Sequence, residues 1–294
     1  MKEIVVISGK GGTGKTSITA SFAQLGGGEL VVADCDVDAA DLHLLLQPQD
    51  TNSSDFFSGY LADIQPEKCT GCGLCADICR FDAIHPTGDV YRVNRLDCEG
   101  CGYCARICPT EAIEMEEQNV GQWYFSQTRI GSPMVHARLG IGAENSGKLV
   151  ARVKKEARAF AGKNGQTLVL VDGSPGIGCP VVSSLSGADL AVLITEPTVS
   201  GLHDLKRVYQ LVAKFRIPAA CIINKSDLNS DVTREILSFL KKENIVHLAN
   251  IPYNENFTRA MTTGKTIVEY ENGDLKSTIS DSWKKILTLI AGEK

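Results

Sequence analysis

The sequence near the start of the chain reads Ile4-Val5-Val6-Ile7-Ser8 and then Gly9-Lys10-Gly11-Gly12-Thr13-Gly14-Lys15-Thr16. The second part fits G-x-x-x-x-G-K-[ST], the phosphate-loop pattern, in the context that this pattern requires: a buried strand before it and a helix after it. Backbone N–H groups of such a loop point inward and form an anion cradle at a helix N-terminus. The stretch therefore predicts a site for a nucleoside triphosphate.

Two side chains of the loop have expected roles. The ammonium of Lys15 is expected to reach the outer phosphates, and the hydroxyl of Thr16 to complete the shell of a bound Mg²⁺. A glycine-rich turn without a ligand is the alternative, and the flanking strand and helix disfavour it. The predicted nucleotide-binding residues of this region are Gly9, Lys10, Gly11, Gly12, Thr13, Gly14, Lys15, Thr16 and Ser17.

Length and composition set the limits for the rest of the chain. It has 294 residues, 43% hydrophobic and 22% charged, which suits one large α/β domain plus a small module. The net charge of −5 gives no electrostatic case for nucleic acid or for an anionic membrane. Met1-Lys2 leads directly into the first strand, so no targeting signal is expected. The 11 cysteines fall mostly in metal-type runs, which favours a reducing, cytoplasmic location.

Eight cysteines form two runs with the same spacing, C-x2-C-x2-C-x3-C. Three thiolates on one tight loop can hold three corners of a cubane, and the fourth cysteine of each run binds the other cluster. The spacing therefore predicts two [4Fe–4S] clusters. Zinc is the alternative, although zinc sites usually pair two C-x2-C knuckles across a hinge. The predicted ligands are Cys69, Cys72, Cys75 and Cys108 for one cluster, and Cys98, Cys101, Cys104 and Cys79 for the other.

The two runs resemble those of bacterial two-cluster ferredoxins. The second run is followed by Pro109, as in that family, whereas Arg80 follows the first run. The resemblance implies a small α+β ferredoxin domain at residues 63–118, inserted into an ATPase domain made of residues 1–62 and 119–294.

Carboxylates follow two apolar runs that read as buried strands. Asp34 and Asp36 follow residues 30–33, and Asp172 follows residues 168–171. Ligands bind at the C-terminal ends of strands in parallel α/β sheets, so these carboxylates are expected near the loop. The alternation of strands and helices predicts an α/β fold with a doubly wound, mostly parallel sheet.

Lys10, in K-G-G-T-G-K-T, and the run Asp172-Gly173-Ser174-Pro175-Gly176 give a resemblance to a family. They resemble the deviant Walker A, MinD/ParA-type P-loop ATPases of the SIMIBI class. The resemblance implies Mg²⁺-dependent ATP hydrolysis in a nucleotide-sandwich homodimer, with Lys10 crossing to the partner's nucleotide. It also implies that Asp36 positions the attacking water, Asp172 holds Mg²⁺ through water, and the Gly176 N–H senses the γ-phosphate. The implied catalytic set is Lys10, Lys15, Asp36 and Asp172.

The sequence allows two interpretations of which nucleotide base is bound, guanine or adenine. Asn224-Lys225-Ser226-Asp227 resembles the guanine-recognising N-K-x-D, which favours GTP. The MinD/ParA-type family instead uses the equivalent of Asn224 beside adenine and a proline loop, here with Pro252, on the other face. We therefore expect ATP.

Four local predictions concern the remaining segments. Residues 48–55 are expected to form a loop, and residues 140–142 a glycine-rich joint. Asn145-Ser146 is expected to cap a helix over residues 147–161. The C-terminal stripe is expected to dock on the core rather than on a membrane; it consists of Trp283, Ile286, Leu287 and Ile290.

Together these patterns predict an ATPase with two [4Fe–4S] clusters. The expected role is to couple ATP binding and hydrolysis to electron delivery or carrier work, in the assembly or activation of a metalloprotein or redox partner. Two alternatives remain: a redox-sensing nucleotide switch that recruits partners, and a partitioning or positioning ATPase. No nucleic-acid partner is expected, and membrane binding is disfavoured.

Overall fold

The computed structural model describes residues 1–38, 40–140 and 145–292. The chain divides into two compact units: the first unit, Met1–Ser54 with Gln122–Lys294, and the second unit, Asp55–Gly121. The chain leaves the first unit along strand β3 (Gln49–Ile64) and returns along β6 (Ile113–Gln127). Both cysteine runs belong to the second unit.

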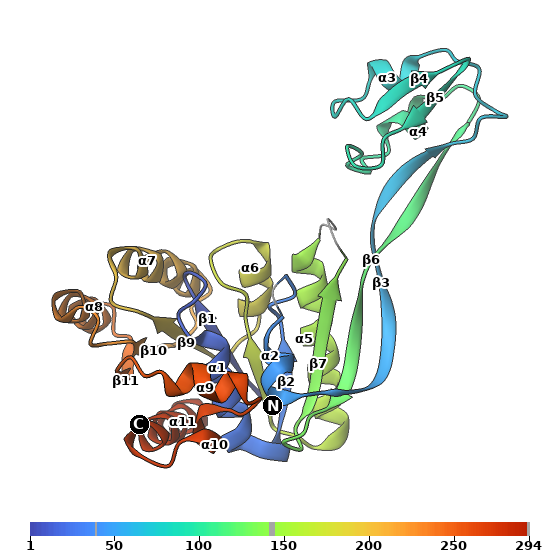
Figure 1. Ribbon diagram of the computed structural model, residues 1–294. Helices are drawn as coiled ribbons and strands as arrows, with labels where there is room; N and C mark the ends of the chain where they lie inside the picture. Colours follow the sequence, from blue (N-terminus) through green and yellow to red (C-terminus); the bar gives the residue numbers. More distant parts are fainter. Residues whose placement is uncertain (39, 141–144, 293–294) are drawn as a thin grey trace. The chain divides into compact units, whose positions relative to one another are not determined.

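The first unit is built on a large sheet with the strand order β11-β10-β9-β1-β8-β2-β7-β6-β3 (Figure 1). All neighbouring strands from β11 to β7 pair in parallel. The predicted mostly parallel α/β sheet is therefore confirmed. Its parallel strands are β1 (Lys2–Ser8), β2 (Leu30–Asp34), β7 (Pro133–Leu139), β8 (Leu168–Asp172), β9 (Leu190–Thr195), β10 (Ala219–Asn224) and β11 (Val246–Ile251).

Helices cover both faces of this sheet (Figure 1), which explains why its strands are continuous apolar runs. Ile4 and Val6 of β1 belong to the core under α1, α10 and α11, and α5, α6 and α7 pack on the strands elsewhere. The helices are α1 (Lys15–Gly26), α2 (Leu42–Leu46), α5 (Ser146–Asn164), α6 (Cys179–Leu185), α7 (Val199–Lys214), α8 (Ser230–Lys242), α9 (Asn256–Thr262), α10 (Ile267–Tyr270) and α11 (Asp274–Ala291), with a 3-10 turn at Gly27–Glu29.

The C-terminal helix α11 docks on the core, as predicted. Trp283 and Ile286 are buried, and the Trp283 ring stacks on Phe22 of α1 with the centroids 5.2 Å apart. Leu287 stays partly exposed. Among the described residues, no helix is long and apolar enough to cross a membrane.

Two of the local predictions are wrong. Residues 49–55, which were expected to form a loop because they are polar, are instead part of the long strand β3. Helix α5 forms as expected, but Asn145 makes no capping hydrogen bond from its side chain and has a left-handed φ of 74°. In the predicted glycine-rich joint, residues 141 and 142 lie outside the described residues.

The second unit carries a doubled backbone pattern. Each cysteine run forms a loop and one short helix, α3 (Leu74–Asp77) or α4 (Tyr103–Ile107). Asp82 and Glu111, at equivalent places in the two runs, both have a φ of 51°. A two-stranded antiparallel sheet completes the unit, β4 (Ile84–Thr87) and β5 (Val90–Val93). Its small core consists of Ala62, Ile64, Cys75, Ile84, Cys104 and Ile113.

Candidate functional site

The phosphate loop lies between β1 and α1, and two of its glycines are required by close contacts. Gly14 has a φ of 87° just before α1, and a Cβ there would come within 2.4 Å of the Asn224 amide nitrogen. A Cβ on Gly9 would come within 2.5 Å of the backbone of Asp204. Asn224 Nδ2 also donates to the carbonyl of Thr13 over 2.8 Å. The loop is therefore shaped by the end of β10 and by the backbone of α7 as well as by its own sequence.

Lys15 is buried at the first turn of α1, against two carboxylates. Its Nζ lies 2.9 Å from Asp172 Oδ1 and 3.3 Å from Asp36 Oδ2. Burial acts to lower the pKa of Lys15, but the charges of Asp172 and Asp36 outweigh it, and the pKa is raised. Lys15 is therefore held as an ammonium. To reach a phosphate, it exchanges carboxylate partners for phosphate oxygens.

Asp172, at the end of β8, accepts hydrogen bonds from two threonine hydroxyls of α1. Thr16 Oγ1 donates to Asp172 Oδ2 over 3.0 Å, and Thr19 Oγ1 lies 2.8 Å from Asp172 Oδ1. The sequence analysis did not identify Thr19. Its signal is helical spacing, since a residue four positions after Lys15 lies on the same face of α1.

The buried charges of this site do not balance. Asp34, Asp36 and Asp172 converge near one lysine. Asp34 Oδ1 accepts from the Asp36 backbone N–H over 3.2 Å, and the buried Asp34 Oδ2 has no partner among the described residues. Burial, followed by the charge of Asp172, raises the pKa of Asp34 well above its usual value, and burial also raises the pKa of Asp36. A cation would relieve this excess of negative charge.

The donor set suits Mg²⁺ rather than a metal held by protein alone. Among the described residues, no three His, Cys, Asp or Glu side chains lie close enough to hold one metal ion. Mg²⁺ is usually bound through one or two carboxylates together with phosphate oxygens and waters. Thr16 and Asp172 provide the protein part of such a shell.

Gly176 lies at the same end of the sheet, and its backbone N–H already makes a hydrogen bond. It has a φ of 93°, and its N–H donates to the carbonyl of Ser8 over 2.9 Å. Sensing a γ-phosphate through this N–H requires the loop after β8 to release Ser8. That role stays a prediction.

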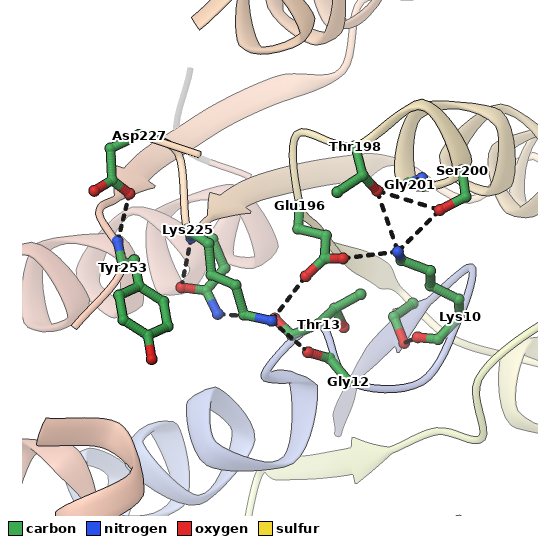
Figure 2. Close-up of polar contacts among 12 residues, drawn as sticks. Lys10, Gly12, Thr13, Glu196, Thr198, Ser200, Gly201, Lys225, Asp227 and Tyr253 are labelled. Carbon is green, nitrogen blue, oxygen red and sulfur yellow. Dashed lines mark hydrogen bonds and ion pairs between the residues drawn. The ribbon is translucent and has the colours of Figure 1, made fainter. Parts of the chain in front are cut away.

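Lys10 lies beside Glu196, at the end of β9 (Figure 2). Its Nζ is 2.7 Å from Glu196 Oε1, and Lys225 Nζ is 2.8 Å from Glu196 Oε2. Glu196 is not among the site residues predicted from the sequence. Its position at the C-terminal end of a parallel strand was the available signal.

The expected base-binding residues lie in two loops that contact each other. Asp227 Oδ1 accepts from the backbone N–H of Tyr253 over 2.6 Å (Figure 2), and the preceding residue, Pro252, is exposed. Asn224 is occupied with the carbonyl of Thr13. The structure thus brings the N-K-x-D run and the proline loop together next to the phosphate loop.

The eight cysteines of the second unit line two separate cavities. The first cavity is lined by Cys69, Cys72, Cys75 and Cys108, together with apolar side chains that include Ile64. The second is lined by Cys79, Cys98, Cys101 and Cys104, together with apolar side chains that include Met115. In each cavity, the last cysteine of one run joins the first three cysteines of the other.

The sulfurs also receive matching hydrogen bonds. The backbone N–H of Ala83 donates to Cys79 Sγ over 3.4 Å, and that of Ala112 donates to Cys108 Sγ over 3.3 Å. N–H···S bonds of this kind stabilise thiolates bound to iron–sulfur clusters. Among the described residues, no three of these cysteines form a group that could hold a single metal ion.

A parallel sheet, a phosphate loop after β1 and a carboxylate at the end of the adjacent β8 define a P-loop nucleotide-binding protein. Comparison of the sequence with family models agrees. Residues 4–267 match the model of the CobQ/CobB/MinD/ParA nucleotide binding domain, and the chain belongs to this family. The predicted MinD/ParA-type relationship is therefore confirmed, with ATP and Mg²⁺ as ligands that fit the family.

Individual relatives extend this comparison. The chain is 36% identical over 230 residues to an uncharacterized protein of Methanocaldococcus jannaschii, covering 78% of this chain and 79% of the relative. It resembles the septum site-determining protein MinD of Pyrococcus horikoshii complexed with Mg-ADP, with 20% identity, a TM-score of 0.60 and coverage of 100% and 98%. It also resembles a ParA family ATPase of Chlorobium tepidum, with 17% identity, a TM-score of 0.55 and coverage of 96% and 98%. Both solved structures show the shared fold.

Proposed function

We propose that the chain is a Mg²⁺-dependent ATP hydrolase. The observation that carries this proposal is the arrangement of Lys15, Thr16 and Asp172 around the start of α1. Lys15 neutralises the outer phosphates, Thr16 and Asp172 hold Mg²⁺, and Asp36 orients the attacking water. Phosphoryl transfer depends mainly on positioning and on charge stabilisation, and these residues supply both.

The active form in this proposal is a homodimer with nucleotide between the two copies. Lys10 is one residue into the loop, and its side chain is 27% exposed, so its ammonium is able to turn toward a second copy. An added positive charge at the γ-phosphate stabilises the charge that develops during transfer. The adenine then lies between Asn224 and the Pro252 loop.

The test is steady-state ATP hydrolysis with and without Mg²⁺. Lys15→Ala should lower the rate by about 10²- to 10³-fold, the usual effect of removing one charge-stabilising group. Lys163→Ala, a lysine exposed on α5, is the matched control and should keep the wild-type rate. Hydrolysis that is unchanged in Lys15→Ala would remove the phosphate-loop assignment.

We also propose that the second unit is a ferredoxin-like domain with two [4Fe–4S] clusters. Supporting it are the two four-cysteine cavities and the N–H···S bonds from Ala83 and Ala112. When bound, the clusters would supply one-electron chemistry, held by the ligand sets predicted from the spacing. Zinc fits less well, since zinc sites usually pair two C-x2-C knuckles across a hinge rather than three cysteines of one run with the last cysteine of the other.

Two biological roles compete. In the first, nucleotide turnover drives electron delivery or carrier work toward a redox or metalloprotein partner. In the second, which the likeness to MinD and ParA structures favours, the ATPase positions a partner, and the clusters act as a switch or a structural element. ATP-dependent reduction of a co-purifying metalloprotein supports the first role. ATP-dependent recruitment of a partner without its reduction supports the second role. Recruitment that differs between the oxidised and reduced protein then assigns the clusters as a switch, and identical recruitment assigns them as a structural element.

A further inference from the structure

The last cysteine of each run, Cys79 or Cys108, lies in a backbone environment that is the same in both runs. Each of these two sulfurs accepts a hydrogen bond from the backbone N–H four residues later, from Ala83 or Ala112. The residue just before that donor has a φ of 51° in both runs. Any difference between the two sulfurs therefore comes from the side chains around them.

One of the two sulfurs has an additional hydrogen-bond partner. Thr110 Oγ1 lies 3.6 Å from Cys108 Sγ. A cysteine that binds a cluster is a thiolate, which only accepts hydrogen bonds, so the hydroxyl is the donor there. Phe81 has the equivalent place two residues after Cys79, and its ring offers no such donor. In the part of the chain that the structure describes, only the Ala83 N–H donates to Cys79 Sγ.

A second difference follows the first cysteine of each run. The residue there is Thr70, which lines the first cavity, or Glu99, which lines the second. A carboxylate beside a cluster opposes the addition of negative charge, whereas a threonine does not. Glu99 is exposed, so water screens its charge and its effect is the smaller one. It nevertheless acts in the same direction as the missing donor at Cys79.

These differences bear on reduction, because one added electron increases the negative charge on the cluster and its sulfurs. Hydrogen bonds to the sulfurs are among the features that set cluster reduction potentials, and they stabilise the more negative, reduced form. We propose that Thr110 makes the cluster of the first cavity the easier one to reduce, so that the first electron from a low-potential one-electron donor resides there. No proton moves and no covalent bond changes in this transfer. The inference rests on the proposed [4Fe–4S] clusters.

The test is a redox titration of the intact protein without oxygen, with dithionite as the reductant and electron paramagnetic resonance as the readout. Cys72→Ser and Cys101→Ser each remove a ligand of one cavity and thereby assign the signals. In the wild type, the first electron should favour the cluster of the first cavity by about tenfold, which corresponds to about 59 mV. One hydrogen bond to a charged group is sufficient for a preference of this order.

Four variants test the origin of this preference. Thr110→Val keeps the side-chain shape but removes the hydroxyl, and should reduce the preference by about three- to tenfold. Phe81→Thr places a hydroxyl beside Cys79 and should also reduce it, by raising the potential of the other cluster. Glu99→Gln should reduce it by no more than about twofold. Thr87→Val, at an exposed position on β4, is the matched control and should leave it unchanged.

The variants are compared at equal iron content. Equal potentials of the two clusters in the wild type would overturn the proposal, and so would a preference in Thr110→Val equal to that in Thr87→Val. Either result leaves the two clusters in place. If Thr110→Val does not assemble its cluster, Phe81→Thr decides, and an unchanged preference there contradicts the proposal. Protein without any [4Fe–4S] signal after reconstitution would instead contradict the proposed clusters, and this inference with them.

Discussion

The nucleotide site and the second unit are held in order by different kinds of contact. Around Lys15 and Asp172, the polar groups of the first unit bind one another, inside a core that spans several helices. In the second unit, Cys75 and Cys104 are themselves part of a small core, and the other cysteines face two cavities. Below about 70–80 residues, a single core seldom stabilises a domain without a metal or disulfides. We therefore expect the first unit to fold on its own contacts and the second unit to depend on the proposed clusters.

The largest expected effect follows from removing the clusters. Without iron, the second unit should lose its order, and proteolytic cleavage within Asp55–Gly121 should become at least about tenfold faster. The first unit should stay resistant and keep its ATP affinity within about twofold, because its core and the ion pair of its nucleotide site are formed by its own residues. Limited proteolysis with mass spectrometry measures both. Equal resistance of the second unit with and without iron would contradict the comparison.

A smaller effect is expected from breaking a single ligand position. Cys108→Ser should remove the cluster of the first cavity, so that about half of the iron is lost. The electron paramagnetic resonance spectrum of the Cys108→Ser variant should match that of Cys72→Ser and differ from that of Cys101→Ser, because Cys108 and Cys72 line the same cavity. Cys179→Ser, in the first unit, is the control and should keep all of the iron. A Cys108→Ser spectrum that matches Cys101→Ser would show that the cavities are assigned wrongly.

How far the sequence predicts the two regions follows from the kind of signal that each carries. The phosphate loop and the cysteine runs are local patterns with fixed spacing, so their residues were named without a structure. Thr19 and Glu196 depend on which strand ends meet, and that is a property of the sheet order rather than of any local pattern. The strand character of residues 49–55 was missed because their polarity is typical of a loop.

Asp34 gives a prediction of intermediate size about the nucleotide site. Its pKa is raised in the folded protein, so its protonated form stabilises the fold at low pH, and this contribution is lost as the pH rises through the folded-state pKa. Asp34→Asn should remove that slope and stabilise the first unit at high pH by about 1–3 kcal/mol, the cost of an unpaired buried group. Urea unfolding as a function of pH is the measurement. A slope that persists in Asp34→Asn would assign it to another group.

The smallest expected effect concerns an ion pair between Arg129 and Glu269. The two terminal guanidinium nitrogens of Arg129, Nη1 and Nη2, lie 2.7 Å from the Glu269 carboxylate oxygens, and these hydrogen bonds lower the pKa of Glu269 to about 2. The pair therefore stabilises the fold above the unfolded-state pKa of Glu269, and the contribution is lost as the pH falls toward about 2.

Glu269→Gln should cost no more than about 1 kcal/mol at pH 7, since such pairs are partly solvated, and less near pH 3. Urea unfolding at the two pH values is the measurement. Glu255→Gln breaks the exposed pair with Arg259 and is the matched control, with no expected change. A loss that is equal at both pH values would contradict the assignment to this carboxylate.

The central claim is that one chain joins a P-loop nucleotide site to a second unit that we propose holds two [4Fe–4S] clusters. The most direct measurement is iron, acid-labile sulfide and zinc in protein purified without oxygen. The account predicts brown protein with about eight iron and eight sulfide per chain. Colourless protein that carries zinc after anaerobic reconstitution with iron and sulfide would contradict it.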